Sequence, residues 1–173
     1  LLQRVGLPEV RAKLLLKALQ QLAGGGASSS TPDPDQRSKR TIPHLTNEDP
    51  KPIASGAQGT IHLAKFHGAP CVVKRFIRGV NRPEFDRETK AWKKFHHPNI
   101  VHLLAFLGPP DAVIVMERMA CSLYDMLKDK SKSLSFFQRV EMGGQIAAGV
   151  SYLHAKDFVH RDIKSLNVLV RGR

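Results

Sequence analysis

Apolar and polar residues alternate with different periods in different parts of the chain. Between Val5 and Leu22, apolar side chains recur every three or four positions with Lys and Arg between them, which predicts one amphipathic helix. From Gly24 to Pro50 the sequence is rich in Gly, Ser, Pro and charged residues and has few side chains that could fill a core. We therefore expect a helix over 1–23, a flexible linker over 24–49 and a folded domain over 50–173.

The folded domain is expected to begin with strands and to continue with helices. Apolar runs bounded by Gly and Pro predict four strand regions, at 53–66 (two strands joined by a glycine turn), 71–74, 101–106 and 112–116. A helix is predicted from Asn81, which has the N-x-x-E spacing of an N-cap with Glu84. A short helix from Ser122 and a long one over 136–154, with Phe137, Val140 and Leu153 among its periodic apolar residues, complete an α+β pattern.

One acidic residue, Glu88, lies within the apolar face of the helix that begins at Asn81. Phe85 and Trp92 recur around it at helical spacing. A carboxylate that faces a core needs a cation, because burying it unpaired is costly. Lys74, on the preceding predicted strand, is the expected partner. The alternative is that Glu88 reaches solvent at the edge of the helix.

Length and composition describe an ordinary globular chain. The 173 residues are 42% hydrophobic and 24% charged, which suits one domain of usual size. No apolar run approaches the length that a membrane helix needs, so no membrane partner is expected. The first residues resemble neither a signal peptide nor an initiator Met, and we expect the N-terminus to have been cut from something longer. Cys71 and Cys121 lack the spacing of a disulfide framework or zinc site, which favours free thiols in the cytoplasm or nucleus.

The net charge is strongly positive, at +12 with 27 Lys and Arg against 15 Asp and Glu. Such a balance raises nucleic acid as a partner, because contacts between Lys or Arg and phosphates dominate that affinity. The cations are scattered from Arg37 to Arg173 and the aromatic residues, at 6%, do not form an interleaved stacking platform. We keep a basic nucleic-acid-binding module as the rival hypothesis and favour a solvated basic surface.

The most specific pattern is at residues 160–167, which read His-Arg-Asp-Ile-Lys-Ser-Leu-Asn. The order and spacing H-R-D-x-K-x-x-N resembles the catalytic loop of a protein kinase. The resemblance implies that Asp162 accepts the proton of the substrate hydroxyl, that Lys164 faces the γ-phosphate and that Asn167 binds a magnesium ion. Lys164 and the wording that follows it are most similar to the tyrosine-kinase-like group of Ser/Thr kinases.

Further parts of the kinase pattern occur upstream in the same order as in that family. Gly56, Gly59 and Ile61 match the second and third glycines and the Val of G-x-G-x-x-G-x-V. Lys74 ends a Cys-Val-Val-Lys run that is similar to V-A-I-K, and Glu88 follows at the place of the helix glutamate that pairs with that lysine. Because the motifs occur in this order over about 120 residues, chance agreement is negligible.

The resemblance implies a fold, cofactors and partners. The fold is α+β, with a five-stranded antiparallel N-lobe sheet and one helix, followed by the first helices of an incomplete C-lobe. Met116 corresponds to the gatekeeper behind the adenine pocket, and residues 117–119 correspond to the hinge whose backbone binds adenine. The partners implied are ATP, Mg²⁺ and a protein substrate. The residues implied around the nucleotide are Ala54, Gly56, Gly59, Ile61, Val72, Lys74, Glu88, Met116, Glu117, Met119 and Leu169.

The sequence departs from the kinase pattern at three places. Ala54 stands where the first glycine of the loop belongs, and Val72 replaces the small residue that usually faces adenine. The 173 residues contain no D-F-G segment, whose Asp holds a second metal contact. We expect the parent protein to phosphorylate Ser/Thr hydroxyls and this chain alone to be inactive. The alternative is a truncated or pseudokinase-like regulatory module.

The predicted N-terminal helix carries a second, weaker resemblance. The wording Val5-Gly6-Leu7, Arg11 and then 15–19 is similar to the end of a sterile alpha motif domain. If so, oligomerisation through this helix or its parent domain is implied. The alternative is a packing helix of no particular family.

Overall fold

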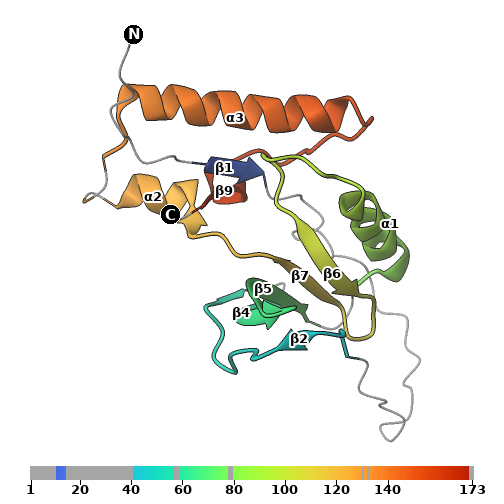
Figure 1. Cartoon of the computed structure of the whole chain (residues 1–173). Helices are drawn as coiled ribbons and strands as arrows, with labels where there is room; N and C mark the ends of the chain where they lie inside the picture. Colours follow the sequence, from blue (N-terminus) through green and yellow to red (C-terminus); the bar gives the residue numbers. More distant parts are fainter. Residues whose placement is uncertain are drawn as a thin grey trace, which may run out of the picture. The chain divides into compact units, whose positions relative to one another are not determined.

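The computed structural model describes residues 11–14, 41–56, 59–77, 80–129, 131 and 133–171. The chain divides into two compact units (Figure 1). The first, called here the sheet unit, comprises residues 17–95 and 102–118. The second, called the helical unit, comprises residues 1–16, 96–101 and 119–173.

The sheet unit is built on one antiparallel sheet. Its strand order is β2-β4-β5-β7-β6, and β3 pairs separately with β4. The five predicted N-lobe strands are confirmed as β3 to β7, and the short β2 is an addition. The bounds are Leu45–Thr46 (β2), Ala54–Gly56 (β3), Gly59–Phe66 (β4), Ala69–Phe76 (β5), Leu103–Leu107 (β6) and Val113–Glu117 (β7).

The folded domain begins earlier than the sequence predicts. Residues 41–49, which the sequence assigns to the linker, contain β2, and Leu45 pairs with Phe66 of β4. Ile42 and Leu45 pack against the buried residues of the sheet. The prediction of a linker is wrong here, because two apolar side chains three positions apart suffice to cover a sheet edge even in a polar stretch. Residues 15–40, which include the rest of the predicted linker, lie outside the described residues.

The two faces of this sheet carry different layers. One face holds a buried core formed by Ala64, Cys71, Val73, Val113 and Val115. The helix α1, Arg82–Lys93, packs by its Phe85 ring, which lies 5.7 Å from the Phe76 ring of β5 and 6.3 Å from the Phe106 ring of β6. The predicted N-cap is confirmed, because the side chain of Asn81 accepts a hydrogen bond from the Glu84 N–H at 3.2 Å.

In its described residues, the helical unit contains α2, α3, a 3₁₀ helix and a small sheet. α2 and α3 are N-capped by Ser122 and Ser135, each of which forms a capping box, and α3 has the predicted bounds. The sheet has the order β1-β9-β8. The bounds are Arg11–Leu14 (β1), Cys121–Ser122 (β8), Leu123–Lys128 (α2), Phe136–His154 (α3), Ser165–Asn167 (a 3₁₀ helix) and Val168–Arg171 (β9).

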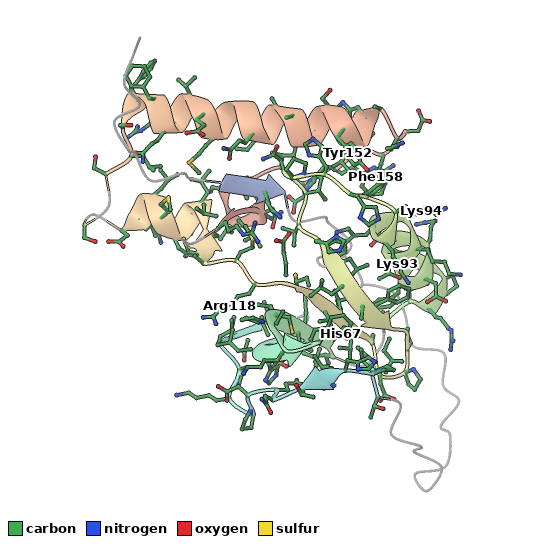
Figure 2. The ribbon with its side chains drawn as sticks, in the orientation of Figure 1. His67, Lys93, Lys94, Arg118, Tyr152 and Phe158 are labelled. Carbon is green, nitrogen blue, oxygen red and sulfur yellow. The ribbon has the colours of Figure 1, made fainter. Side chains whose placement is uncertain are left out.

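Residues 96–101 of the helical unit are attached to α3 through Tyr152, which is labelled in Figure 2. Its ring stacks on His97 with centroids 4.8 Å apart, and its hydroxyl oxygen accepts a hydrogen bond from the His96 N–H at 3.0 Å. The adjacent histidines of the sequence therefore have structural contacts within this unit.

The predicted N-terminal helix is wrong where the structure describes it. Arg11–Leu14 forms a strand that pairs antiparallel with β9, from Arg11 opposite Arg171 to Leu14 opposite Val168. The helical period of this segment is a weak local preference, and pairing with a strand more than a hundred residues away overrides it. The rest of residues 1–23 lies outside the described residues, so the resemblance to a sterile alpha motif stays a prediction.

The described helices do not include a membrane-spanning one, because none has the length and apolar character that crossing a bilayer requires.

Candidate active site

The register of the sheet unit places five of the predicted nucleotide-binding side chains on one face. Ala54 pairs with Ile61, Ile61 pairs with Lys74, and Val72 pairs with Met116. Directly opposed residues of an antiparallel pair point to the same face, and so do residues two apart in a strand. Because Val72 and Lys74 are two apart, all five side chains share that face.

The glycine turn joins β3 to β4 and has one position that only glycine can occupy. Gly59 has φ +148°, and a Cβ on it would lie 1.9 Å from the carbonyl oxygen of Arg75 on β5. Gly56, opposite Gly59 in the register, has open space around its Cα. Ala54 is exposed in an ordinary strand, and residues 57–58 lie outside the described residues. Gly59 is therefore required by the close approach of two strands.

Lys74 is the buried cation of this face. Its residue is 8% exposed, and its Nζ lies 4.9 Å from the centroid of the Phe76 ring. Burial lowers the pKa of Lys74 to about 8, because removing the ammonium group from water disfavours its charged form. Because burial removes the ammonium group from bulk water, its attraction to a phosphate is weakly screened.

Glu88 lies on the side of α1 that faces Lys74. Phe76, two positions after Lys74 on β5, shares its face and contacts Phe85 of α1, and Glu88 follows Phe85 by one turn. Glu88 is half-buried and its Oε2 is fully buried. The geometry agrees with the predicted pairing of Glu88 with Lys74, and the pairing itself stays a prediction.

The hinge region begins at Glu117, whose role in the sheet the sequence did not reveal. Its Oε1 accepts a hydrogen bond from the His102 N–H at 2.7 Å, and its own N–H donates to the His102 carbonyl oxygen at 3.1 Å. The predicted gatekeeper Met116 is 4% exposed. Glu117 therefore closes the end of β7 against the start of β6. Arg118 follows in the sheet unit and Met119 belongs to the helical unit.

The predicted catalytic residues of the helical unit converge on one carboxylate oxygen. Asn167 Nδ2 lies 2.8 Å from Asp162 Oδ2, and Lys164 Nζ lies 3.1 Å from the same atom. The Asn167 amide also donates to the Asp162 carbonyl oxygen at 2.8 Å. Asn167 is 2% exposed, whereas the Asp162 side chain is 23% exposed and can meet a substrate.

Two further features fix the chain that leads into Asp162. The Asp162 N–H donates to His160 Nδ1 at 3.3 Å, and His160 is 1% exposed. Arg161, between them, has φ +63°, in the left-handed region that non-glycine residues rarely adopt. The sequence motif named these residues but gave no sign of the strained backbone, because Arg carries no preference for that region.

The two groups of predicted residues thus form separately, each within its own unit. The sheet unit gathers Ala54, Ile61, Val72, Lys74 and Met116 on one face. The helical unit gathers Asp162, Lys164 and Asn167, and places Leu169, half-buried, in the strand that follows them.

The side chains present suit the cofactors that the motifs imply. A buried lysine is suited to phosphate, because its positive charge attracts the phosphate oxygens. Magnesium takes oxygen ligands, and Asn167 turns its NH₂ group to Asp162, so its amide oxygen is the group with which it would hold the ion. When bound, the ion would neutralise charge on the phosphates.

The antiparallel sheet, the buried Lys74 and the Asp162 loop are together the features of one class of protein, the protein kinase domain. The family described as protein tyrosine and serine/threonine kinase matches residues 48–173, and the chain belongs to this family. The five expected strands, the helix α1 and the Asp162 loop all lie within the matched range.

Several curated proteins are similar to this chain. The serine/threonine-protein kinase CTR1 of Arabidopsis thaliana is 38% identical over 130 residues, which are 68% of this chain and 16% of that protein. The probable serine/threonine-protein kinase SIS8 of the same plant is 36% identical over 126 residues, which are 68% of this chain and 12% of that protein. The tyrosine-protein kinase SRK3 of Spongilla lacustris is 28% identical over 134 residues, 75% of this chain and 40% of that protein. The chain therefore spans less than half the length of each.

Proposed function

We propose that this domain serves phosphate transfer from MgATP to Ser or Thr hydroxyls of a protein substrate in a signalling kinase. The observation that carries the proposal is the arrangement of Asn167 and Lys164 around Asp162 Oδ2. A general base must be oriented and partly accessible, and Asp162 meets both conditions. We also propose that the protein is located in the cytoplasm or the nucleus.

The residues have distinct roles in the proposed reaction. Lys74 attracts the phosphates, and Asp162 orients the acceptor hydroxyl and takes its proton as the hydroxyl oxygen bonds to the γ-phosphorus and the bond from that phosphorus to the leaving ADP breaks. Lys164 places a positive charge beside Asp162, where negative charge develops on the transferred group. Asn167 fixes the Asp162 carboxylate and offers an amide oxygen to magnesium.

Two observations favour Ser/Thr over Tyr as the acceptor. A lysine two positions after the loop aspartate resembles the Ser/Thr-directed kinases, and Lys164 has this position and contacts Asp162. Two of the similar proteins are named serine/threonine kinases, at higher identity than the one named a tyrosine kinase.

Phosphate transfer to Ser, Thr and Tyr peptides tests the proposal. We expect no transfer by the 173 residues alone, because they contain no D-F-G segment. The assay therefore includes a longer chain in which a D-F-G segment and the remainder of a kinase domain follow the same residues. There, Asp162→Asn should lower kcat by about 10²- to 10⁴-fold with Ser or Thr peptides.

Activity that survives Asp162→Asn would show that another group is the base. Preference for the Tyr peptide would overturn the acceptor class. Asp157→Asn, an exposed carboxylate of the same unit, is the matched control and should leave the rate unchanged.

A further inference from the structure

Residues 42–49, called here the strap, lie on the sheet face that is opposite to Lys74. β2 in the strap pairs with β4 (Figure 1), and Ile42 and Leu45 pack against the buried core that includes Val73. Val73 and Lys74 are neighbours on β5, and neighbouring side chains of a strand point to opposite faces. The strap therefore covers the face that does not carry the predicted nucleotide-binding side chains.

The end of the strap contacts β4 through His62. The Asp49 N–H donates to the Leu63 carbonyl oxygen at 2.8 Å, and the Asp49 carbonyl oxygen lies 2.8 Å from His62 Nδ1. A carbonyl oxygen only accepts hydrogen bonds, so Nδ1 carries the ring hydrogen in this contact. His62 Nε2 lies 2.8 Å from Thr60 Oγ1, and His62 is 9% exposed. His62 thus links the strap to Thr60, the residue directly after Gly59.

The same part of the strap contacts β5 through Arg75. The guanidinium group of Arg75 donates to both carboxylate oxygens of Glu48, from Nε to Oε1 at 2.6 Å and from Nη2 to Oε2 at 2.5 Å. Such a two-point pair fixes direction as well as distance. Arg75 pairs with Thr60 in the register, and its carbonyl oxygen is the atom that a Cβ on Gly59 would meet. Glu48 and Asp49 therefore hold both strands beside the Gly59 backbone.

We propose that Glu48 and Asp49 form a clamp that fixes the base of the glycine turn from the strap side of the sheet, with His62 and Arg75 as its two positioning residues. The clamp keeps the backbone at Gly59 in its close approach to β5, so the turn that precedes Gly59 starts from a fixed position. Its effect on nucleotide affinity rests on the proposed function, whereas its effect on the turn does not. Release of the strap would loosen the turn and weaken ATP binding, although the strap lies on the other face.

Substitutions of His62 separate a positioning role from simple packing. His62→Phe keeps a ring but has no side-chain donor, whereas His62→Asn keeps an N–H donor near the position of Nδ1. Thr46→Ala, at an exposed residue of the strap, is the matched control. The readouts, on the 173-residue chain, are amide hydrogen exchange of residues 59–61 without nucleotide and ATP affinity by calorimetry.

His62→Phe should raise exchange of residues 59–61 by about tenfold and weaken ATP binding by about threefold or more, because the strap loses its hydrogen bond to β4. His62→Asn should give clearly smaller changes in both, and Thr46→Ala should change neither. Unchanged exchange in His62→Phe, or equal effects of the Phe and Asn substitutions, would overturn the role of His62.

A substitution of Glu48 tests the contact with Arg75 and decides the proposal if His62→Phe does not fold. Glu48→Gln removes a charge from a side chain that is 22% exposed and leaves the core intact. It should raise the same exchange by about threefold or more, and unchanged exchange would overturn the clamp. Because one clamp is released from either end, the effects of His62→Phe and Glu48→Gln should be less than additive in the double variant. Additive effects would show two independent contacts and contradict a single clamp.

The two readouts keep the clamp and the proposed function apart. Raised exchange with unchanged ATP affinity would overturn the effect of the strap on nucleotide binding. If the wild-type chain binds no ATP, the proposed nucleotide site fails, and exchange measured without nucleotide still decides whether the clamp fixes the turn.

Discussion

Lys74 combines burial with a charge that the proposed nucleotide site needs. Its pKa, lowered to about 8 by burial, leaves the ammonium form dominant at neutral pH and loses it at mildly alkaline pH. The residue is 8% exposed, so water screens its field little. Nucleotide affinity should therefore depend on the protonation state of this one side chain.

We expect Lys74→Met to weaken ATP binding at pH 7 by about tenfold or more. A charge contact near 4 Å at an effective dielectric of about 20 is worth more than about 1.4 kcal/mol, which is the free energy of a tenfold change in affinity. As pH rises through about 8, wild-type affinity should fall toward that of the variant. Calorimetric titration of both chains at pH 7 and pH 9.5 measures this. Equal affinities at pH 7, or parallel pH dependence, would contradict the role of Lys74.

Gly59 and Gly56 offer a matched pair in one turn. An Ala side chain at Gly59 would meet the Arg75 carbonyl oxygen at 1.9 Å and sit at φ +148°, whereas Gly56 has open space. Gly59→Ala should lower the free energy of unfolding by about 2 kcal/mol or more, and Gly56→Ala should change it by less than about 1 kcal/mol. Urea unfolding of the three chains checks this, and similar losses at both positions would show that the close approach is unimportant.

Single residues divide into those whose role the sequence identifies and those whose structural role it does not indicate. Asp162, Asn167 and Lys74 belong to spaced motifs, so sequence alone named them before their contacts were known. Glu117 acts through its hydrogen bonds to His102. Arg161 acts through its left-handed φ. Both depend on where the backbone lies in three dimensions, which residue type and spacing do not specify.

α3, whose signals are local, has the bounds that the sequence predicts. α3 starts at its Ser135 cap, where Ser135 Oγ accepts from the Gln138 N–H at 3.2 Å and Gln138 Oε1 accepts from the Ser135 N–H at 2.9 Å. The capping box explains why the polar Gln138 is buried. Phe136 and Phe137, which precede it, are each 74% exposed. From the helical period alone, Phe137 is expected on the buried face of α3.

We expect Ser135→Ala to cost about 1 kcal/mol of unfolding free energy, because it leaves N–H groups of the first turn without their side-chain acceptor. Ser151→Ala is the control, since Ser151 is exposed in the same helix and Ala is the better helix former. Guanidinium unfolding followed by circular dichroism compares the two. A loss no larger in Ser135→Ala than in Ser151→Ala would mean that the cap does not limit the stability of α3.

β1 shows where local signals fail at the scale of an element. Its residues have a helical pattern, yet they pair with β9, which begins more than 150 residues later. β2 was missed for a related reason, since its two residues become a strand only because β4 offers an edge. Strand identity depends on a partner, whereas helix caps and periods are encoded within about fifteen residues.

At the scale of the whole molecule, the fold divides the kinase motifs between two units. The glycine turn, Lys74, Glu88 and Met116 belong to the sheet unit, and the Asp162 loop belongs to the helical unit. The order of motifs in the sequence identified both groups. The chain belongs to the helical unit at 1–16 and 96–101, returns to the sheet unit at 102–118 and then stays in the helical unit, so the two groups of motifs fall into different units.

The net charge of +12 is a property of the whole chain and bears on its partners. Exposed cations of the sheet unit are spread over separate elements: Lys93 and Lys94 lie at the end of α1 and Arg118 follows β7 (Figure 2). Arg75 is engaged by Glu48, with Nε 2.6 Å from Oε1. Tight binding to duplex DNA needs several cations that meet consecutive phosphates, and these described positions do not form one stripe.

We therefore expect no binding of mixed-sequence DNA or RNA oligonucleotides with Kd below about 1 μM at physiological salt. Any weak binding should fall steeply with salt, by a log–log slope of about 0.9 for each duplex phosphate contacted, whereas ATP binding through Lys74 should depend on salt much less. Fluorescence anisotropy at 50 and 200 mM salt measures the oligonucleotide, and calorimetry measures ATP under the same conditions. Lys93→Glu with Lys94→Glu should leave ATP affinity unchanged, because both side chains are exposed at the end of α1 and neither is among the residues proposed to bind the nucleotide. Submicromolar oligonucleotide binding that this double substitution abolishes would make the end of α1 a nucleic-acid site and overturn the assignment of the basic surface as solvated.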